Sequence, residues 1–164
     1  MAAGLTYEPI ATTTTSGSAA TVTFSSISGT YTDLVMVMSF SLSGNQEVYI
    51  RFNSDAGTNY SRTYMEGNGS TASSARSNTT NQINILGRDT QMVNTINFMN
   101  YSNSTTYKTT LARFSGFSSA AGSIVGGEVG LWQNTNAITT IGLSLSAGNF
   151  TNGSVITLYG IKAA

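Results

Sequence analysis

Strict alternation of apolar and polar side chains is the feature that most constrains how this chain folds. Between Asp33 and Ser43, large apolar side chains occupy every second position: Leu34, Met36, Met38, Phe40 and Leu42. The segment from Glu47 to Asn53 repeats the pattern with Val48, Ile50 and Phe52. Because successive side chains of a β-strand point to opposite faces, this period predicts strands with one buried face.

The same signal covers most of the chain. Further strands are predicted at Ala20 to Phe24, Tyr60 to Met65, Asn81 to Leu86, Val93 to Tyr101, Thr109 to Phe117, Ile124 to Trp132, Ile138 to Ser146 and Val155 to Ile161, with Leu5 to Thr12 as an additional candidate. We find no segment with the apolar spacing of three and four residues that a helix requires. The stretch from Gly67 to Thr80 consists mostly of small polar residues and is expected to be one long exposed loop.

Many short strands without helices predict two packed antiparallel sheets or a barrel. Of these, we expect an all-β fold, an antiparallel β-sandwich that is jelly-roll-like, with about 8 to 11 strands in a single domain. Residues 1–17 are expected to form an N-terminal arm or edge strand with a polar linker, Thr12 to Ser18. Residues 18–164 are expected to form the sandwich.

Composition narrows the function classes. The chain has 164 residues, with seven basic and seven acidic side chains and neither His nor Cys. The usual general base, thiolate nucleophiles and common zinc ligands are therefore missing, and we expect a non-enzymatic protein. Balanced charge does not supply the basic field that nucleic acids need, and no stretch is apolar enough to span a membrane. Solubility comes from neutral polar residues, 25 Thr, 23 Ser and 15 Asn, and such a surface suits a protein that packs into an assembly.

Two carboxyl groups leave one reaction that needs no His, glycoside hydrolysis, as an alternative activity. Glycoside hydrolysis requires only two carboxyl groups that face each other across a cleft. Glu66 and Glu128 are the nearest candidates, because each follows or precedes aromatic strand residues. The alternative, which we favour, is that they are solvated strand ends or partners of Arg side chains.

The segment after the Glu47 to Asn53 strand has a weak resemblance to a calcium loop. Asn53, Asp55 and Asn59 recur at alternate positions, and Gly57 allows a sharp turn. Calcium loops place oxygen ligands in this way, so calcium is the one cofactor left open. The twelfth position is Tyr64 and supplies no bidentate carboxylate. We favour a turn in which the Asn and Asp side chains accept hydrogen bonds from backbone donors.

Aromatic residues near predicted strand ends offer a second binding hypothesis. Trp132, Tyr60 and Tyr64 lie near predicted strand ends or loops, and Trp132 is followed by Gln133 and Asn134. Flat apolar faces beside amide side chains suit stacking against sugars and hydrogen bonding to them. A carbohydrate-binding module is therefore an alternative function. The competing interpretation is that Trp132 anchors a core or an interface.

Three segments together resemble small virion structural proteins of tailed bacteriophages, especially phages of cyanobacteria and other aquatic bacteria. They are Val22 to Val35, Ile50 to Ser61 and Gly153 to Ile161. The resemblance implies a β-sandwich displayed on a virion as a capsid decoration, fibre or tail-associated protein, often a homotrimer, with no catalytic residues. It implies further copies of the chain and phage capsid or tail proteins as partners. Host surface glycans are a further partner if the protein also serves adhesion.

The N-terminal segment is a candidate for the assembly contact. Leu5, Tyr7 and Ile10 are spaced around Glu8 and Pro9. This pattern is typical of an edge strand or of an arm that docks on a neighbouring molecule. We expect the segment to contribute to self-association, where many copies make weak contacts firm.

Overall fold

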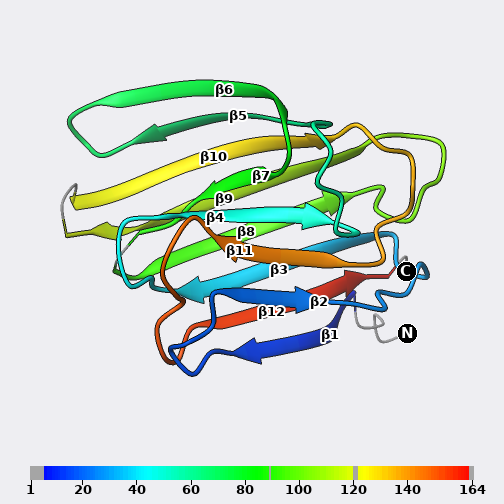
Figure 1. Cartoon of the computed structure of the whole chain (residues 1–164), viewed down its shortest axis with the longest axis horizontal. Helices are drawn as coiled ribbons and strands as arrows, with labels where there is room; N and C mark the ends of the chain where they lie inside the picture. Colours follow the sequence, from blue (N-terminus) through cyan, green and yellow to red (C-terminus); the bar gives the residue numbers. More distant parts are fainter. Residues whose placement is uncertain (1–5, 89, 120–121, 163–164) are drawn as a thin grey trace.

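The computed structural model describes residues 6–88, 90–119 and 122–162. These residues form twelve strands and no helix (Figure 1): β1 (Tyr7–Thr14), β2 (Thr21–Phe24), β3 (Asp33–Phe40), β4 (Glu47–Phe52), β5 (Tyr60–Gly67), β6 (Ala72–Thr80), β7 (Ile83–Leu86), β8 (Met92–Met99), β9 (Lys108–Ser118), β10 (Gly122–Trp132), β11 (Ile141–Leu145) and β12 (Val155–Ile161). Within this described part, no helical segment could cross a membrane.

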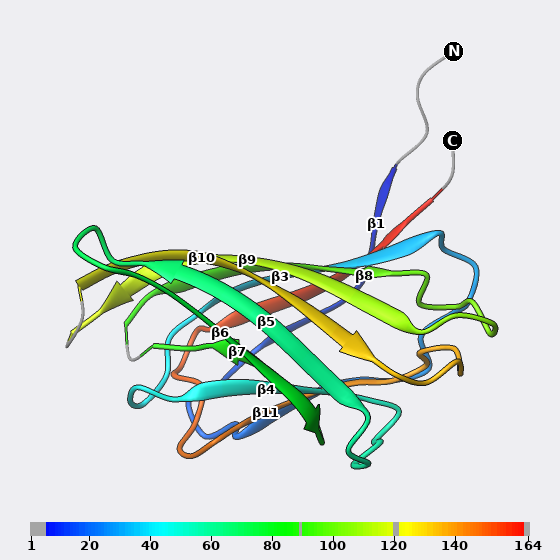
Figure 2. The same cartoon turned by 90° about the horizontal axis from the view of Figure 1, so that it is seen from above.

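The strands form two sheets stacked face to face (Figure 2). The large sheet has eight strands in the order β1-β12-β3-β8-β9-β10-β5-β6, and the small sheet has four in the order β2-β11-β4-β7. Neighbouring strands pair in antiparallel fashion throughout. The predicted antiparallel β-sandwich is therefore confirmed, with twelve strands in place of the expected 8 to 11.

Eight of the strands have the jelly-roll arrangement. When β5, β6, β9 and β10 are set aside, the sheets become β1-β12-β3-β8 and β2-β11-β4-β7. The chain then alternates between the two sheets at every step except from β4 to β7. This is the connectivity of two Greek keys folded into a double-layered jelly roll.

Two inserted hairpins enlarge one sheet. The β5–β6 hairpin lies between β4 and β7 in the chain, and the β9–β10 hairpin lies between β8 and β11. Both add to the large sheet on the side away from β1, because β9 pairs with β8 and β10 pairs with β9 and β5. At the top of Figure 1, β6 projects past the small sheet.

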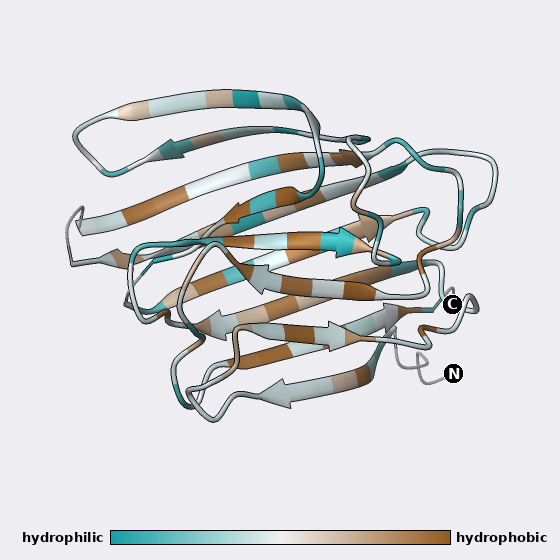
Figure 3. Ribbon diagram, viewed as in Figure 1, coloured by the Kyte–Doolittle hydropathy of each residue, from teal (hydrophilic) through white to brown (hydrophobic). Residues whose placement is uncertain are grey.

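Apolar side chains from both sheets meet between the layers. In β4, Val48, Ile50 and Phe52 are buried, whereas the side chains between them are half-buried, as the alternation predicts. Figure 3 shows the same alternation of brown and pale segments along most strands. The largest fully buried side chains of the core are Trp132, Tyr60, Tyr101, Phe40, Phe52, Phe98 and Phe150.

The predicted loop from Gly67 to Thr80 is wrong over most of its length. Residues Ala72–Thr80 form β6, which pairs with β5 as the outermost strand of the large sheet. The turn lies at Asn68, whose side-chain oxygen accepts hydrogen bonds from the backbone N–H groups of Ser70 and Thr71. Because β6 is exposed on both faces, it carries no apolar alternation, and its strand conformation comes from pairing with β5.

The N-terminal strand closes the opposite edge of the large sheet. β1 pairs with β12, with a bulge between Pro9 and Ala11. Proline and bulges are found at sheet edges because proline lacks the N–H that an inner strand needs. Thr12 to Thr14, expected in the polar linker, belong to β1 and pair with β12.

Candidate functional site

The turn after β4 is a structural clamp. The backbone of Asn53 has a φ of 52°, and its side-chain oxygen accepts hydrogen bonds from the N–H groups of Thr139 and Thr140 at 2.9 and 3.0 Å. Its side-chain nitrogen donates to the carbonyl oxygen of Ala137 at 2.8 Å. Asn53 thus ties the end of β4 to the connection that enters β11.

Asp55 is held by donors of its own. Its Oδ1 accepts from the N–H of Gly57 at 2.8 Å, and its Oδ2 accepts from Asn59 at 2.9 Å and from the Trp132 indole at 2.7 Å. Burial alone would raise the pKa of Asp55, but these hydrogen bonds, with one from Asn134, hold it below the ordinary value.

The contacts of Asn53 and Asp55 favour the turn interpretation over a calcium site at Asn53, Asp55 and Asn59. The oxygens of Asn53 and Asp55 already face N–H donors, which would repel a cation, and they serve different parts of the fold. In the described residues no group of three His, Cys, Asp or Glu side chains is arranged to hold a metal ion. The turn interpretation accounts for these residues.

Trp132 and Tyr60 do not form an exposed sugar platform. Trp132 is 1% exposed and Tyr60 is 0% exposed, and their rings stack with centroids 6.2 Å apart. The Tyr60 hydroxyl contacts the backbone of Phe52 and Asp55. Both rings lie at strand ends, as expected, but the turn from Asn53 to Asn59 covers them. The core interpretation of Trp132 therefore holds.

Tyr64 lines a pocket between the layers. The pocket has a volume of about 220 Å³ and lies between β5 and β10 of the large sheet and the small sheet. Its walls comprise Glu47, Arg62, Tyr64, Glu66, Arg88, Phe114 and Glu128. Glu66 and Glu128, the carboxyl groups singled out from the sequence, thus line the same cavity.

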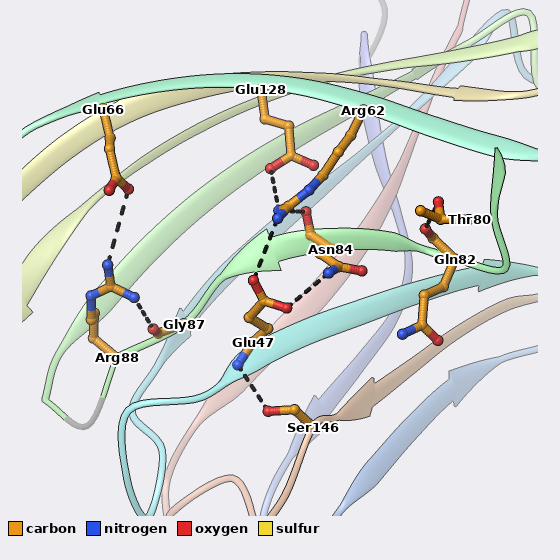
Figure 4. Close-up of polar contacts among 10 residues, drawn as sticks. All are labelled: Glu47, Arg62, Glu66, Thr80, Gln82, Asn84, Gly87, Arg88, Glu128 and Ser146. Carbon is orange, nitrogen blue, oxygen red and sulfur yellow. Dashed lines mark hydrogen bonds and ion pairs between the residues drawn. The ribbon is translucent and has the colours of Figure 1, made fainter. Parts of the chain in front are cut away.

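Arg62 is the centre of this pocket (Figure 4). It extends from β5, and its Nη1 donates to the carbonyl oxygen of Asn84 at 2.8 Å. Its Nη2 lies 3.4 Å from Glu47, and its Nη1 lies 3.6 Å from Glu128. Asn84 in turn donates to the second oxygen of Glu47 at 2.8 Å. The guanidinium group therefore links both sheets.

A second ion pair lies beside the first. Glu66 is 4.0 Å from Arg88, and its other carboxylate oxygen accepts a hydrogen bond from Ser73 at 3.4 Å. Arg88 also donates to the carbonyl oxygen of Gly87 at 2.9 Å. In Figure 4 this pair stands next to the Arg62 cluster, with Glu66 on the large sheet and Arg88 on the far side.

Glu128 is the most buried acid of the pocket. Only 3% of the residue is exposed. Burial raises the pKa of Glu128 to about 8, with a further rise from the charge of Glu47, while Arg62 acts in the opposite direction. Glu128 is therefore largely protonated at neutral pH.

The outer face of the large sheet is a second candidate surface. One row of paired residues runs across β10, β9, β8, β3 and β12: Val125, Ser115, Val93, Ser39 and Val155. Exposed apolar side chains in this and neighbouring rows are Val37, Met65, Val93, Met99, Leu111, Phe117, Val125, Val129 and Val155. Arg113 is the charged side chain in the middle of this face.

The apolar surface is hollowed near the inserted hairpins. An open groove of about 520 Å³ lies over β10, β5 and β6, with Met65 and Val125 on its sides. These two side chains are 67% and 62% exposed. Gly126 and Gly127 form part of its lining, and Gly127, which is in step with the outward residues Val125 and Val129, has no side chain to fill the hollow.

The N-terminal candidates for assembly lie at one edge of the large sheet. Tyr7 is 56% exposed and packs edge-to-face on Tyr159, with ring centroids 6.3 Å apart. Ile10 is half-buried against the core. Leu5 lies outside the described residues. The structure thus places Tyr7 on the surface and gives Ile10 a role in packing.

Comparison with protein families and with curated protein sequences finds no match to this chain.

Sequence reasoning missed Arg62, Glu47 and Arg88 as members of the pocket. The sequence does indicate the inward position of one residue of the pocket. Glu128 alternates in step with Ile124 and Trp132, which places its side chain on the inward face of β10. An inward acid in a strand requires a partner, because an isolated charge in the core is costly. Which side chain would partner it depends on strand register and on how the sheets stack.

Proposed function

We propose that this chain is a non-enzymatic structural protein of a phage virion, of the capsid decoration or fibre type. In this proposal the outer face of the large sheet meets further copies of the chain, in a trimer, and so fixes the protein in the particle. The observation that carries the proposal is the set of exposed apolar side chains on five neighbouring strands, β10, β9, β8, β3 and β12, with Arg113 as the charged side chain among them.

The size of this face supports self-association. Strands in a sheet are about 4.8 Å apart and rise about 3.3 Å per residue, so eight strands of about eight residues cover on the order of 900 Å². A stable interface buries roughly 800 Å² on each partner. Exposed apolar patches of several hundred Å² are typical of interaction sites.

The resemblance of three segments to phage virion proteins supports the same proposal. Val22 to Val35 passes from the small sheet to the large one, Ile50 to Ser61 contains the Asn53 clamp, and Gly153 to Ile161 includes β12. All three contribute strand residues to the jelly roll, and Ile50 to Ser61 also reaches the first two residues of β5 in the inserted hairpin. A shared jelly roll with different insertions is consistent with proteins that use one scaffold for different attachments.

Sedimentation of the purified chain tests the assembly surface. We expect the wild-type protein to sediment as an oligomer and the double variant Val93→Lys, Val125→Lys to sediment as a monomer with an unchanged circular dichroism spectrum. Thr23→Lys is the matched control, because Thr23 is exposed on the small sheet, and it should sediment like wild type. A monomeric wild-type protein, or a double variant that stays oligomeric, would refute the proposed surface.

The particle itself tests the virion part of the proposal. The chain should be present in purified virions of a phage that encodes it and should occupy repeated density on the capsid or tail in a particle map. Absence of the chain from such particles would refute the proposal, whatever the oligomeric state of the isolated protein.

A further inference from the structure

Three polar atoms that line the pocket between the layers have no hydrogen-bond partner among the described residues. They are Oε1 of Glu128, Nε of Arg62 and Oε2 of Glu66. Glu128 is the most enclosed, with 2% of its side chain exposed. Buried polar atoms in folded proteins are nearly always hydrogen-bonded, to protein groups or to ordered water, so these three atoms are positions where water or the hydroxyl groups of a ligand can bind.

The charges of the pocket favour a neutral occupant. Arg62 and Arg88 carry two positive charges, and Glu47 and Glu66 carry two negative charges. Glu128 is neutral in its protonated form, so the pocket as a whole is balanced at neutral pH. Because the two positive and the two negative charges oppose each other, the pocket offers no net attraction to an anion or to a cation.

Hydroxyl groups match the unpartnered atoms best. A hydroxyl donates one hydrogen bond and accepts two, so neighbouring hydroxyls can donate to a carboxylate and accept from Nε–H of Arg62 together. Phe114 provides an apolar wall suited to the C–H face of a sugar ring, and Tyr64 lies beside it with the Arg62 guanidinium 5.0 Å above the centroid of its ring. We propose that the pocket of Arg62, Glu66 and Glu128 binds one neutral sugar unit through its hydroxyl groups.

The volume of the pocket and the position of its entrance fit a single sugar ring. A volume of about 220 Å³ corresponds to roughly seven water molecules at about 30 Å³ each. This lies below the roughly 300 Å³ at which pockets for drug-sized molecules begin. The side chain of Glu47 is 40% exposed and that of Glu66 is 20% exposed, so the entrance lies on their side of the pocket.

This binding site goes beyond the proposed structural function and does not depend on it. A virion protein that holds a sugar unit would contact glycans on a surface that the particle meets. The site uses the inner face of the large sheet, whereas the proposed assembly surface is the outer face of the same sheet. If the sugar-binding proposal fails, the proposed assembly surface can still hold, and the reverse is also true.

Nuclear magnetic resonance of the ¹⁵N-labelled full chain tests the proposal. Glucose, galactose, mannose and N-acetylglucosamine are titrated separately while the Nε–H signal of Arg62 is followed. We expect at least one sugar to shift this signal saturably, with a dissociation constant in the millimolar range. Sodium phosphate and guanidinium chloride serve as charged probes and should not shift it saturably.

Variants separate binding at the pocket from binding elsewhere. Glu128→Leu should weaken the responding sugar at least tenfold, and Glu8→Gln, which alters an exposed carboxylate paired with Lys162, should leave the affinity unchanged. If Glu128→Leu does not fold, Tyr64→Ala takes its place, because Tyr64 is only half-buried. No saturable shift with any of the four sugars, a shift with a charged probe in their place, or full affinity in the pocket variant would overturn the proposal.

Discussion

Replacing Glu128 by Gln measures how strongly the pocket favours a protonated carboxyl group. Burial raises the pKa of Glu128 from 4.5 to about 8, so between these pH values the folded protein holds a proton that the unfolded chain has released. The free energy of unfolding therefore falls as the pH rises through this interval. At about 1.4 kcal/mol per pH unit, the total loss is about 5 kcal/mol. Gln is neutral at every pH and lacks this loss.

The assay is urea unfolding of both proteins at pH values from about 5 to about 9, followed by the fluorescence of Trp132, the one tryptophan of the chain. Glu47, Glu66, Arg62 and Arg88 are present in both proteins. The difference between the two unfolding free energies therefore isolates Glu128. We expect wild type to lose stability relative to Glu128→Gln as the pH rises, most steeply between about pH 5 and about pH 8.

Glu8→Gln is the control, because Glu8 is an exposed carboxylate at the edge of the large sheet, paired with Lys162. Its free energy of unfolding should change with pH in the same way as that of wild type across this interval. Parallel curves for wild type and Glu128→Gln would refute the reasoning, because they would mean that Glu128 is ionised in the folded protein at neutral pH.

Three further predictions concern the turn after β4. Trp132→Phe removes the indole hydrogen bond to the Asp55 carboxylate and should lower the free energy of unfolding by about 1.5–3 kcal/mol, measured in urea. Asn53→Ala removes four side-chain hydrogen bonds to residues 137–140 and places alanine at positive φ, so it should cost about 2–4 kcal/mol, measured in the same way; a loss below about 1 kcal/mol would contradict the clamp. Addition of calcium or of a chelator should leave the melting temperature unchanged, and a rise of several degrees with calcium would restore a metal site at Asp55.

The strands of the jelly roll could be predicted from the sequence because each buries one face. β12 occupies the predicted residues Val155–Ile161, and β4 ends within one residue of the prediction. β6 could not be predicted in this way, because neither of its faces is buried and its residues have low strand propensity. Its partner β5 supplies the hydrogen bonds that make it a strand.

The candidate sites were predicted less well, since they depend on contacts between distant segments. Trp132 is the last residue of β10 and Tyr60 is the first residue of β5, positions where side chains are often exposed. The turn around Asp55 folds back over both side chains. Glu66 and Glu128 were identified as acids near aromatic residues, yet their shared cavity follows from the register of β5 with β10. The sequence alone does not specify that register.

The pocket lies at the seam between the jelly roll and its insertions. Arg62 and Glu66 belong to β5 and Glu128 to β10, whereas Glu47 belongs to β4 and Arg88 follows β7. The eight strands that define the scaffold therefore contribute only part of the pocket wall. Exchange of residues in the hairpins alters the wall of the pocket and leaves the eight strands of the scaffold unchanged, so selectivity and foldability are able to evolve on separate stretches of one chain.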